Sequence, residues 1–197
     1  MNIAAAKKWL RIYLLRSRGL LGRRKQTALS RKIARTFLRL PEFKKAKTVA
    51  AYLGFGSEVL TEDIVRRAWQ MGKTVLVPVT RRGFRNPYFA KFTPADPLAK
   101  TRYGPLEPRR KTHPHPFKQI DLVLVPGLGF DSKGWRLGFG AGVYDRLLKK
   151  TSRALHIGLC FSVQKLNRIP REKNDKRLGA ILDENGCTFT TVSNSPF

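Results

Sequence analysis

Residues 121–148 combine an apolar run, a glycine-rich stretch and charged side chains, in the sequence DLVLVPGLGFDSKGWRLGFGAGVYDRLL. Glycine allows positive φ angles and a close approach of the backbone to a ligand, and the free N–H groups that begin the following helix attract anions. Arg136 could grip a phosphate, and Asp145 could either hold a nucleotide-borne Mg²⁺ or simply cap the helix. The segment therefore indicates phosphate binding.

Two common nucleotide-binding patterns do not account for this segment. The chain contains no G-x-x-x-x-G-K-[ST] string, which excludes a Walker A loop. The dinucleotide fingerprint needs its glycines in a tight turn directly after a strand, whereas residues 130–136 intervene here, which disfavours a nicotinamide cofactor.

The elements that must position the segment alternate between strand and helix patterns. Short apolar runs predict strands at residues 48–53, 74–79, 88–92, 120–125, 155–161, 180–182 and 188–192. Helical spacing of apolar residues predicts helices at residues 25–40, 61–71 and 144–150, after a basic amphipathic N-terminal helix. This order predicts a three-layer α/β/α fold with a mostly parallel, Rossmann-like open sheet, helices on both faces, and ligands at the carboxyl ends of the strands.

The length of 197 residues fits a single domain, with N-terminal basic helices over residues 4–40 and an α/β core over residues 48–192. No apolar run approaches the roughly 18 residues needed to cross a bilayer. Cys160 and Cys187 form no C-x-x-C pair, so neither a zinc ribbon nor a disulfide framework is indicated. We expect a cytoplasmic monomer with no membrane partner.

Several motifs resemble those of the 5-formyltetrahydrofolate cyclo-ligase family, also called 5,10-methenyltetrahydrofolate synthetases. The strings VPGLGFDSKG and RLGFGAGVYDRLL resemble the family hallmark PG-x-x-FD-x-x-G-x-RLG-x-G-x-GYYD. The other matches are Lys7, Leu10, Arg11 and Arg18 in a basic helix, residues 40–64 with a strand and a glutamate turn, YGPLEP at residues 103–108, and IPREKND at residues 169–175. Because they follow in order along nearly the whole chain, the resemblance is specific.

The resemblance implies an ATP- and Mg²⁺-dependent ligase that converts 5-formyltetrahydrofolate, with or without a polyglutamate tail, to 5,10-methenyltetrahydrofolate. The formyl oxygen would take the γ-phosphoryl group of ATP, a second folate nitrogen would attack the activated carbon, and phosphate would leave. The protein would mainly position the reactants and neutralise charge, as phosphoryl transfer usually requires.

By matching position, the resemblance also implies the site residues. Those that bind ATP would be Lys7, Arg11, Arg136, Leu137, Gly138, Phe139, Gly140, Ala141, Gly142, Val143 and Tyr144, with Arg136 and Tyr144 as the catalytic pair. Those that bind folate would be Leu53, Glu58, Phe139, Gly140, Ala141, Gly142 and Val143. Glu58 would offer its carboxylate to the amino-pyrimidine donors, and Asp145 and Asp175 would hold Mg²⁺.

Three positions depart from the family pattern. Ala141 stands where a lysine is common, Val143 where a second tyrosine is common, and Gly179 where an acidic residue is usual. Losing the lysine removes a positive charge from the phosphate loop, so we expect an active enzyme that binds ATP more weakly than a lysine-bearing relative.

The net charge of +27, from 40 Lys+Arg and 13 Asp+Glu, keeps an alternative open. Such a charge attracts nucleic acid as well as small polyanions, so the chain could be a catalytically weakened cyclo-ligase homologue that binds nucleic acid. Against this alternative, the basic residues are dispersed, and the sequence has no zinc finger, RNP-like aromatic string or concentrated basic arm.

Overall fold

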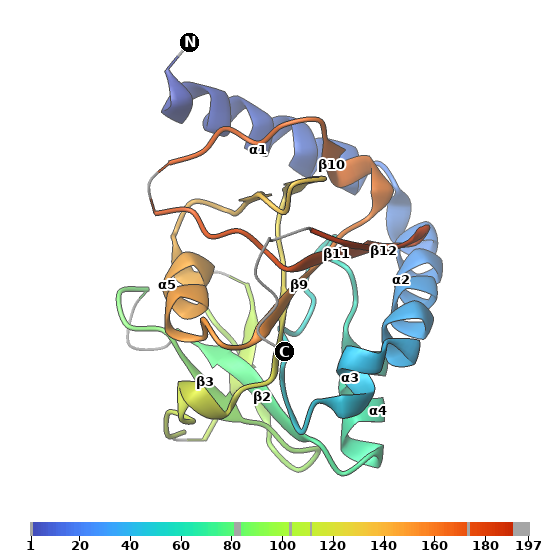
Figure 1. Ribbon diagram of the computed structural model, residues 1–197, viewed down its shortest axis with the longest axis vertical. Helices are drawn as coiled ribbons and strands as arrows, with labels where there is room; N and C mark the ends of the chain where they lie inside the picture. The colour runs from blue at the N-terminus through green and yellow to red at the C-terminus, as the bar shows by residue number, and fades with distance from the viewer. Residues whose placement is uncertain (1, 81–83, 103, 111, 173, 191–197) are drawn as a thin grey trace.

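The computed structural model describes residues 2–80, 84–102, 104–110, 112–172 and 174–190 (Figure 1). Within them the central sheet has seven strands: β1 (Thr48–Ala50), β2 (Thr74–Val79), β3 (Tyr88–Lys91), β6 (Leu122–Val125), β9 (Leu155–Leu159), β11 (Ala180–Asp183) and β12 (Gly186–Phe189). Their order is β12-β11-β9-β6-β1-β2-β3. All neighbours from β11 to β2 are parallel, and β12 and β3 are antiparallel edges. The mostly parallel open sheet predicted from the sequence is confirmed.

Helices cover both faces of this sheet. The covering helices are α2 (Gly22–Arg39), α3 (Pro41–Lys45), α4 (Glu62–Gln70) and α5 (Val143–Lys150), whereas α1 (Ile3–Gly19) packs outside this sheet, against Leu128 and Leu137. In Figure 1, α2, α3 and α4 lie on one side of the sheet and α5 on the other. Phe37 of α2 and Ile64 of α4 pack with Val49 in one buried cluster, while Leu147 of α5 packs with Val123 in a second. The predicted three-layer arrangement is therefore present.

Strand β1 shows why the strands could be read from the sequence. Val49 belongs to one buried cluster and Ala50 to the other, so the strand is covered on both faces. Strands buried on both faces read as continuous apolar runs, which locates them but does not mark where pairing stops. The run continues through Leu53, whereas the ladder ends at Ala50 and the next residues lead into the turn that carries Glu58.

The sequence predicted one continuous loop for the glycine-rich segment, and the structure contradicts this prediction. It contains an antiparallel hairpin of β7 (Gly129–Asp131) and β8 (Arg136–Leu137), and β10 (Lys165–Leu166) pairs with β7. Asp131 Oδ1 closes the hairpin by accepting hydrogen bonds from the backbone N–H groups of Lys133 and Trp135, both at 3.0 Å. Leu14 of α1 packs on this hairpin beside Leu137. The hairpin thus fixes the start of the glycine-rich loop at residues 138–142 against α1.

The segment between β2 and β6 contains more regular structure than the single strand predicted from the sequence. The edge strand predicted at residues 88–92 is confirmed as β3. Additional elements are the antiparallel pair β4 (Leu98–Lys100) and β5 (Leu106–Pro108) and the short 3₁₀ helix η1 (Phe117–Gln119), with a second, η2 (Ser162–Gln164), after β9. Tyr103, Lys173 and the end of the last predicted strand, residues 191–192, lie outside the described residues.

Helix α1 carries basic side chains on its inner face. Lys7 and Arg18 are buried there together with Leu14, and the Asn2 side chain caps the helix by accepting a hydrogen bond from Ala4 N at 3.1 Å. Among the described helices, including this one, none combines the length and apolar character that a membrane span needs.

Candidate functional site

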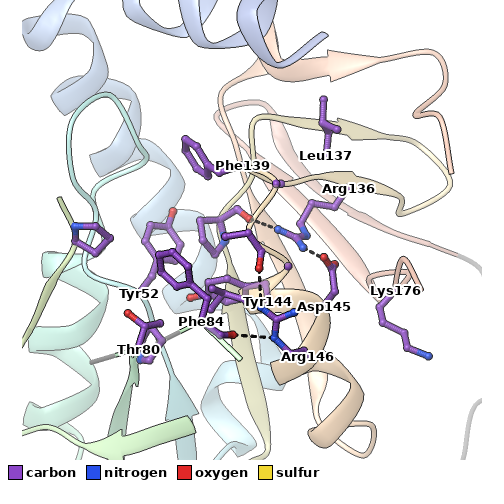
Figure 2. A pocket seen from close by; sticks show the side chains of 18 of the residues that line it. Tyr52, Thr80, Phe84, Arg136, Leu137, Phe139, Tyr144, Asp145, Arg146 and Lys176 are labelled. Carbon is purple, nitrogen blue, oxygen red and sulfur yellow. Dashed lines mark hydrogen bonds and ion pairs between the residues drawn. The ribbon is translucent and has the colours of Figure 1, made fainter. Parts of the chain in front are cut away.

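A cavity of about 820 Å³ opens beyond the carboxyl ends of β1, β2 and β6 (Figure 2). Segments that follow these three strands form much of its wall, and α1 contributes Lys7 and Arg11. After β1 the chain proceeds to β2 on one side, whereas β6 lies on the other side. The cavity therefore lies where the strand order reverses, which is the usual ligand-binding position in open α/β sheets.

The cavity wall contains every residue that the family resemblance implied. These residues are Lys7, Arg11, Leu53, Glu58, Arg136, Leu137, Gly138, Phe139, Gly140, Ala141, Gly142, Val143, Tyr144, Asp145 and Asp175. They come from distant parts of the sequence, since Lys7 and Asp175 are separated by 168 positions yet are in contact. Leu53 both lines the cavity and packs against a buried core cluster.

Arg136 and Asp145 form an ion pair in this wall (Figure 2). Arg136 Nη2 lies 2.6 Å from Asp145 Oδ1, and Nη1 donates to Pro126 O at 3.2 Å. The side chain of Arg136 is only 5% exposed, and its Nε has no hydrogen-bond partner among the described residues. A buried guanidinium that retains an unused donor is suited to binding a phosphate oxygen.

The backbone between Arg136 and α5 depends on glycine. Gly140 and Gly142 have φ angles of +106° and +65°, a region that other residues rarely adopt, and Gly142 is the N-cap of α5. A Cβ on Gly138 would lie 2.8 Å from Arg136 Nη1. Gly140 and Gly142 therefore have the positive φ angles predicted from the sequence, and Gly138 leaves room for the Arg136 side chain, which was not predicted.

Two further arginines of the cavity wall donate hydrogen bonds to backbone oxygens of this loop. Arg11 Nε donates to Gly138 O at 3.0 Å, which links α1 to the loop. Arg146 Nη2 donates to Ala141 O at 2.6 Å, and its Nε donates to Phe84 O at 2.9 Å. Arg146 was not predicted as a site residue, although its place in the first turn of the helix after the glycines was a usable signal.

Tyr144 presents a hydroxyl that is buried and has no hydrogen-bond partner among the described residues. Burial, with a smaller contribution from the negative charge of Glu58, raises the pKa of Tyr144 well above its usual value. The ring lies 5.7 Å from the Arg136 guanidinium carbon. Tyr144 is therefore a neutral phenol whose donor is unused among the described residues.

Lys7 joins the N-terminal helix to the segment that precedes β11. Its Nζ lies 2.7 Å from Asp175 Oδ2 and 2.8 Å from Glu172 Oε2. Burial alone would lower the pKa of Lys7, but the hydrogen bonds and charges of these two carboxylates outweigh it and raise that pKa. Lys7 is therefore a permanent cation at one end of the cavity.

Asp145 and Asp175 have the donor chemistry that Mg²⁺ requires. Both are carboxylates in the wall of one cavity, and each already accepts a hydrogen bond from a cationic side chain. Mg²⁺ usually keeps several waters and binds one or two carboxylates together with substrate phosphates. The described residues include no cluster of three or more His, Cys, Asp or Glu that could hold a metal. These two carboxylates are therefore the described residues of the wall that could hold Mg²⁺ together with phosphate oxygens of a substrate.

Glu58 lies on the turn that follows β1 and is only 4% exposed. Burial raises its pKa to about 7, although the positive charge of Arg18 and the backbone N–H of Phe55 oppose this rise. Phe55 N donates to Glu58 Oε2 at 3.3 Å. Near neutral pH the carboxyl group is therefore divided between its charged and neutral forms.

Comparisons with known proteins assign the family. Residues 3–184 match the 5-formyltetrahydrofolate cyclo-ligase family. The chain belongs to this family. The 5-formyltetrahydrofolate cyclo-ligase of Haemophilus influenzae is 32% identical over 150 residues, which cover 74% of this chain and 80% of that protein. The probable 5-formyltetrahydrofolate cyclo-ligase of Schizosaccharomyces pombe is 31% identical over 191 residues, 89% and 94% of the two chains.

Solved cyclo-ligase structures have the same fold. The NMR structure of Aquifex aeolicus 5,10-methenyltetrahydrofolate synthetase aligns with a TM-score of 0.83 at 30% identity, over 97% of this chain and 96% of that one. The 5,10-methenyltetrahydrofolate synthetase of Mycoplasma pneumoniae aligns with a TM-score of 0.73 at 25% identity, over 90% and 98%. The predicted family, fold and enzyme class are confirmed: the chain is a ligase of folate one-carbon metabolism.

Other cavity residues of this cyclo-ligase were not predicted from the sequence. They are Tyr52, Phe55, Pro78, Thr80, Phe84, Thr101, Pro105, Leu106, Glu107, Pro126, Arg146, Lys149, Glu172, Asn174 and Lys176. Glu107 belongs to the YGPLEP motif, but the sequence did not predict a binding or catalytic role for it. Its Oε1 accepts hydrogen bonds from Thr80 N at 2.8 Å and Thr80 Oγ1 at 2.5 Å, which connects that motif to the end of β2.

Two departures of this cyclo-ligase from the family pattern have local structural explanations. A Cβ on Gly179 would lie 2.7 Å from Leu155 Cδ1, so an acidic side chain there would require the Leu155 side chain to shift. The loop at Ala141 lacks the lysine, but the Arg146 guanidinium supplies a positive charge against its backbone. The structure gives no comparable account of Val143.

Proposed function

We propose that this cyclo-ligase uses ATP and Mg²⁺ to convert 5-formyltetrahydrofolate to 5,10-methenyltetrahydrofolate, with release of ADP and phosphate. The observation that carries the proposal is one cavity whose wall contains both the Arg136–Asp145 pair on a glycine loop and the buried carboxyl of Glu58. Its volume of about 820 Å³ falls within the usual range for small-molecule sites.

The proposed reaction has two bond-forming steps. The formyl oxygen attacks the γ-phosphorus of ATP, so an O–P bond forms and ADP leaves. The folate nitrogen that will close the ring then attacks the formyl carbon, the C–O bond breaks with departure of phosphate, and that nitrogen loses its proton. Phosphoryl transfer of this kind depends on alignment and on neutralisation of charge.

The wall supplies these two requirements through its own residues. Lys7, Arg11 and Arg136 place positive charge where the phosphates would lie, and the N-terminus of α5 adds its N–H groups. The unpartnered hydroxyl of Tyr144 offers a hydrogen bond to the oxygen that leaves the formyl carbon. Asp145 and Asp175 would hold Mg²⁺, which when bound neutralises phosphate charge.

The folate is proposed to occupy the part of the cavity lined by Leu53, Glu58 and Phe139. The amino-pyrimidine edge of a pterin has adjacent N–H donors, and an ionised carboxylate can accept two of them side by side. Glu58 is the buried carboxyl in this position, while Leu53 and Phe139 offer apolar surface to the rings.

Turnover of the purified protein tests the proposal. With ATP, Mg²⁺ and 5-formyltetrahydrofolate, the near-ultraviolet absorbance of the methenyl product should appear, and its appearance should stop when ATP is omitted. Glu58→Gln should weaken folate binding more than ATP binding, and Arg136→Gln should do the reverse. No product, together with tight and salt-sensitive binding of RNA or DNA, would favour the nucleic-acid-binding alternative.

A further inference from the structure

Arg18 is buried behind the wall of the cavity, not in it. The residue is 3% exposed and lies on the inner face of α1. Its Nε donates to Ser57 Oγ at 2.9 Å, and its Nη1 donates to Gly127 O at 3.4 Å. Its guanidinium carbon lies 5.6 Å from the centre of the Phe139 ring. One side chain thus contacts the turn after β1, the segment after β6 and the phosphate loop.

The contacts of Arg18 are themselves held in place. Gln26 Nε2 donates to the backbone oxygen of Arg18 at 3.1 Å, and Gln164 Nε2 donates to Gly127 O at 2.8 Å. Both amide side chains are buried. The guanidinium is therefore fixed relative to α2, η2 and the end of β6.

Arg18 also dominates the positive charge near Glu58. The described titratable groups that interact electrostatically with Glu58 include Arg18 of α1, Tyr52 after β1 and Tyr144 of α5. Arg23 Nη1 of α2 donates to Gly56 O of the same turn at 3.0 Å. Both tyrosines are neutral because burial raises the pKa of each. Among these groups, Arg18 is the cation whose charge favours the ionised form of Glu58.

We propose that Arg18 is a positioning residue for the folate: its buried guanidinium fixes the Glu58 turn relative to Phe139 and favours the negative form of the Glu58 carboxyl, which is the form that the substrate needs. The inference rests on the proposed function. Burying a guanidinium costs free energy that an apolar side chain would not, so packing alone does not explain an arginine here. A neighbouring buried carboxylate whose ionised form binds the substrate would explain an arginine at this position.

The test variant is Arg18→Gln, which removes the charge and keeps a hydrogen-bonding group. Losing an adjacent opposite charge raises the pKa of a carboxyl by roughly 1–3 units. At neutral pH the ionised fraction of Glu58 should fall from about one half to about a tenth or less, so the KM for 5-formyltetrahydrofolate should rise by about fivefold or more. The KM for ATP should change little, and affinity for folate should recover as the pH is raised toward 9.

Three comparisons separate this effect from a loss of structure. Arg18→Lys retains the charge and should restore most of the folate affinity. Arg16→Gln removes the same charge from the exposed face of the same helix and should leave the KM and its pH dependence unchanged. In a Glu58→Gln background, Arg18→Gln should no longer alter the pH dependence. Equilibrium binding of 5-formyltetrahydrofolate without ATP gives the same profile independently of turnover.

The outcomes are distinct. An unchanged profile in Arg18→Gln, or an equal loss of affinity at every pH that Arg18→Lys does not rescue, would overturn the inference and leave the proposed function standing. If the unmodified protein bound no folate and gave no product, both would fail. Should Arg18→Gln not fold, Arg18→Lys alone decides: a pH profile close to that of the unmodified protein supports the inference, and a uniform loss opposes it.

Discussion

Two polar groups in the cavity wall lack the partners that buried groups normally have. The hydroxyl of Tyr144 and Nε of Arg136 are both buried without a hydrogen-bond partner among the described residues. Few buried polar groups in folded proteins are unsatisfied, because each costs about 1–3 kcal/mol. Both side chains line the cavity, so a rotation that brings either group to the cavity surface would let a ligand supply the missing partner.

Tyr144→Phe tests this interpretation. Removing an unsatisfied hydroxyl should leave the free energy of unfolding unchanged or raise it by about 1 kcal/mol. The same change should lower kcat by roughly tenfold or more if the hydroxyl binds the reacting oxygen, because a lost transition-state hydrogen bond costs about that much. Thermal unfolding and steady-state turnover measure the two effects. A less stable variant with full activity would show that the hydroxyl serves the fold.

Ala141→Lys tests the departure in the phosphate loop. Ala141 is exposed, so a longer side chain has room, and an added positive charge near the phosphates should lower the apparent KM for ATP by roughly threefold to tenfold. Ala141→Gln has similar length without the charge and should not reproduce the effect. An unchanged or raised KM in Ala141→Lys would mean that Arg146 already supplies the charge that the loop needs.

At the scale of elements, the sequence predicted what burial determines and missed what single side chains determine. The strands buried on both faces, such as β2 and β6, stood out as apolar runs. The hairpin of β7 and β8 did not, because it has too few residues for a periodic pattern. It is closed by Asp131, whose Oδ2 also accepts a hydrogen bond from Ile169 N at 3.0 Å. Such a tertiary contact cannot be deduced from sequence spacing.

Gly138→Ala tests how the loop and Arg136 are fitted together. The new methyl group would lie 2.8 Å from Arg136 Nη1, so the guanidinium must shift, which weakens the bond of Nη1 to Pro126 O and that of Nη2 to Asp145. We expect the KM for ATP to rise by about tenfold, since a 1.4 kcal/mol loss of binding gives that factor.

Gly19→Ala is the matched control, because a Cβ there would meet no atom within 4 Å. It lies at the end of α1 and should leave activity unchanged. Equal kinetic effects of the two substitutions, or none in Gly138→Ala, would contradict the assigned role of the loop.

At the scale of the molecule, the site is assembled by long-range packing. Lys7 near one end of the chain binds Asp175 near the other, and α1 closes on the hairpin between them. The family resemblance predicted both residues for one ATP and Mg²⁺ site. It could not place Tyr52, Arg146 or Lys176, which belong to the wall through the relative packing of elements.

Two buried titratable groups should give the whole molecule opposing dependences of stability on pH. The pKa of Glu58 rises from 4.5 to about 7 on folding, mainly through burial, so its stabilising contribution is full below the unfolded pKa and is lost as the pH rises through 7. Burial lowers the pKa of His156 from 6.5 to about 4, against an opposing hydrogen bond with Thr151 O. Its contribution is therefore full above 6.5 and is lost as the pH falls through 4.

Glu58→Gln and His156→Gln should therefore change the stability profile in opposite directions. Relative to the unmodified protein, the free energy of unfolding of Glu58→Gln should increase by about 2 kcal/mol between pH 5 and pH 8, because the variant lacks a group whose burial in the ionised form is unfavourable. The free energy of unfolding of His156→Gln, relative to that of the unmodified protein, should decrease by about 2 kcal/mol over the same interval. At pH 5 the unmodified protein is destabilised because His156 is protonated in the unfolded chain and neutral in the folded protein, and at pH 8 this difference is absent. Urea unfolding at the two pH values measures both. A Glu58→Gln profile parallel to that of the unmodified protein would mean that Glu58 titrates normally, and the dependence of folate binding on Arg18 would then lose its electrostatic basis.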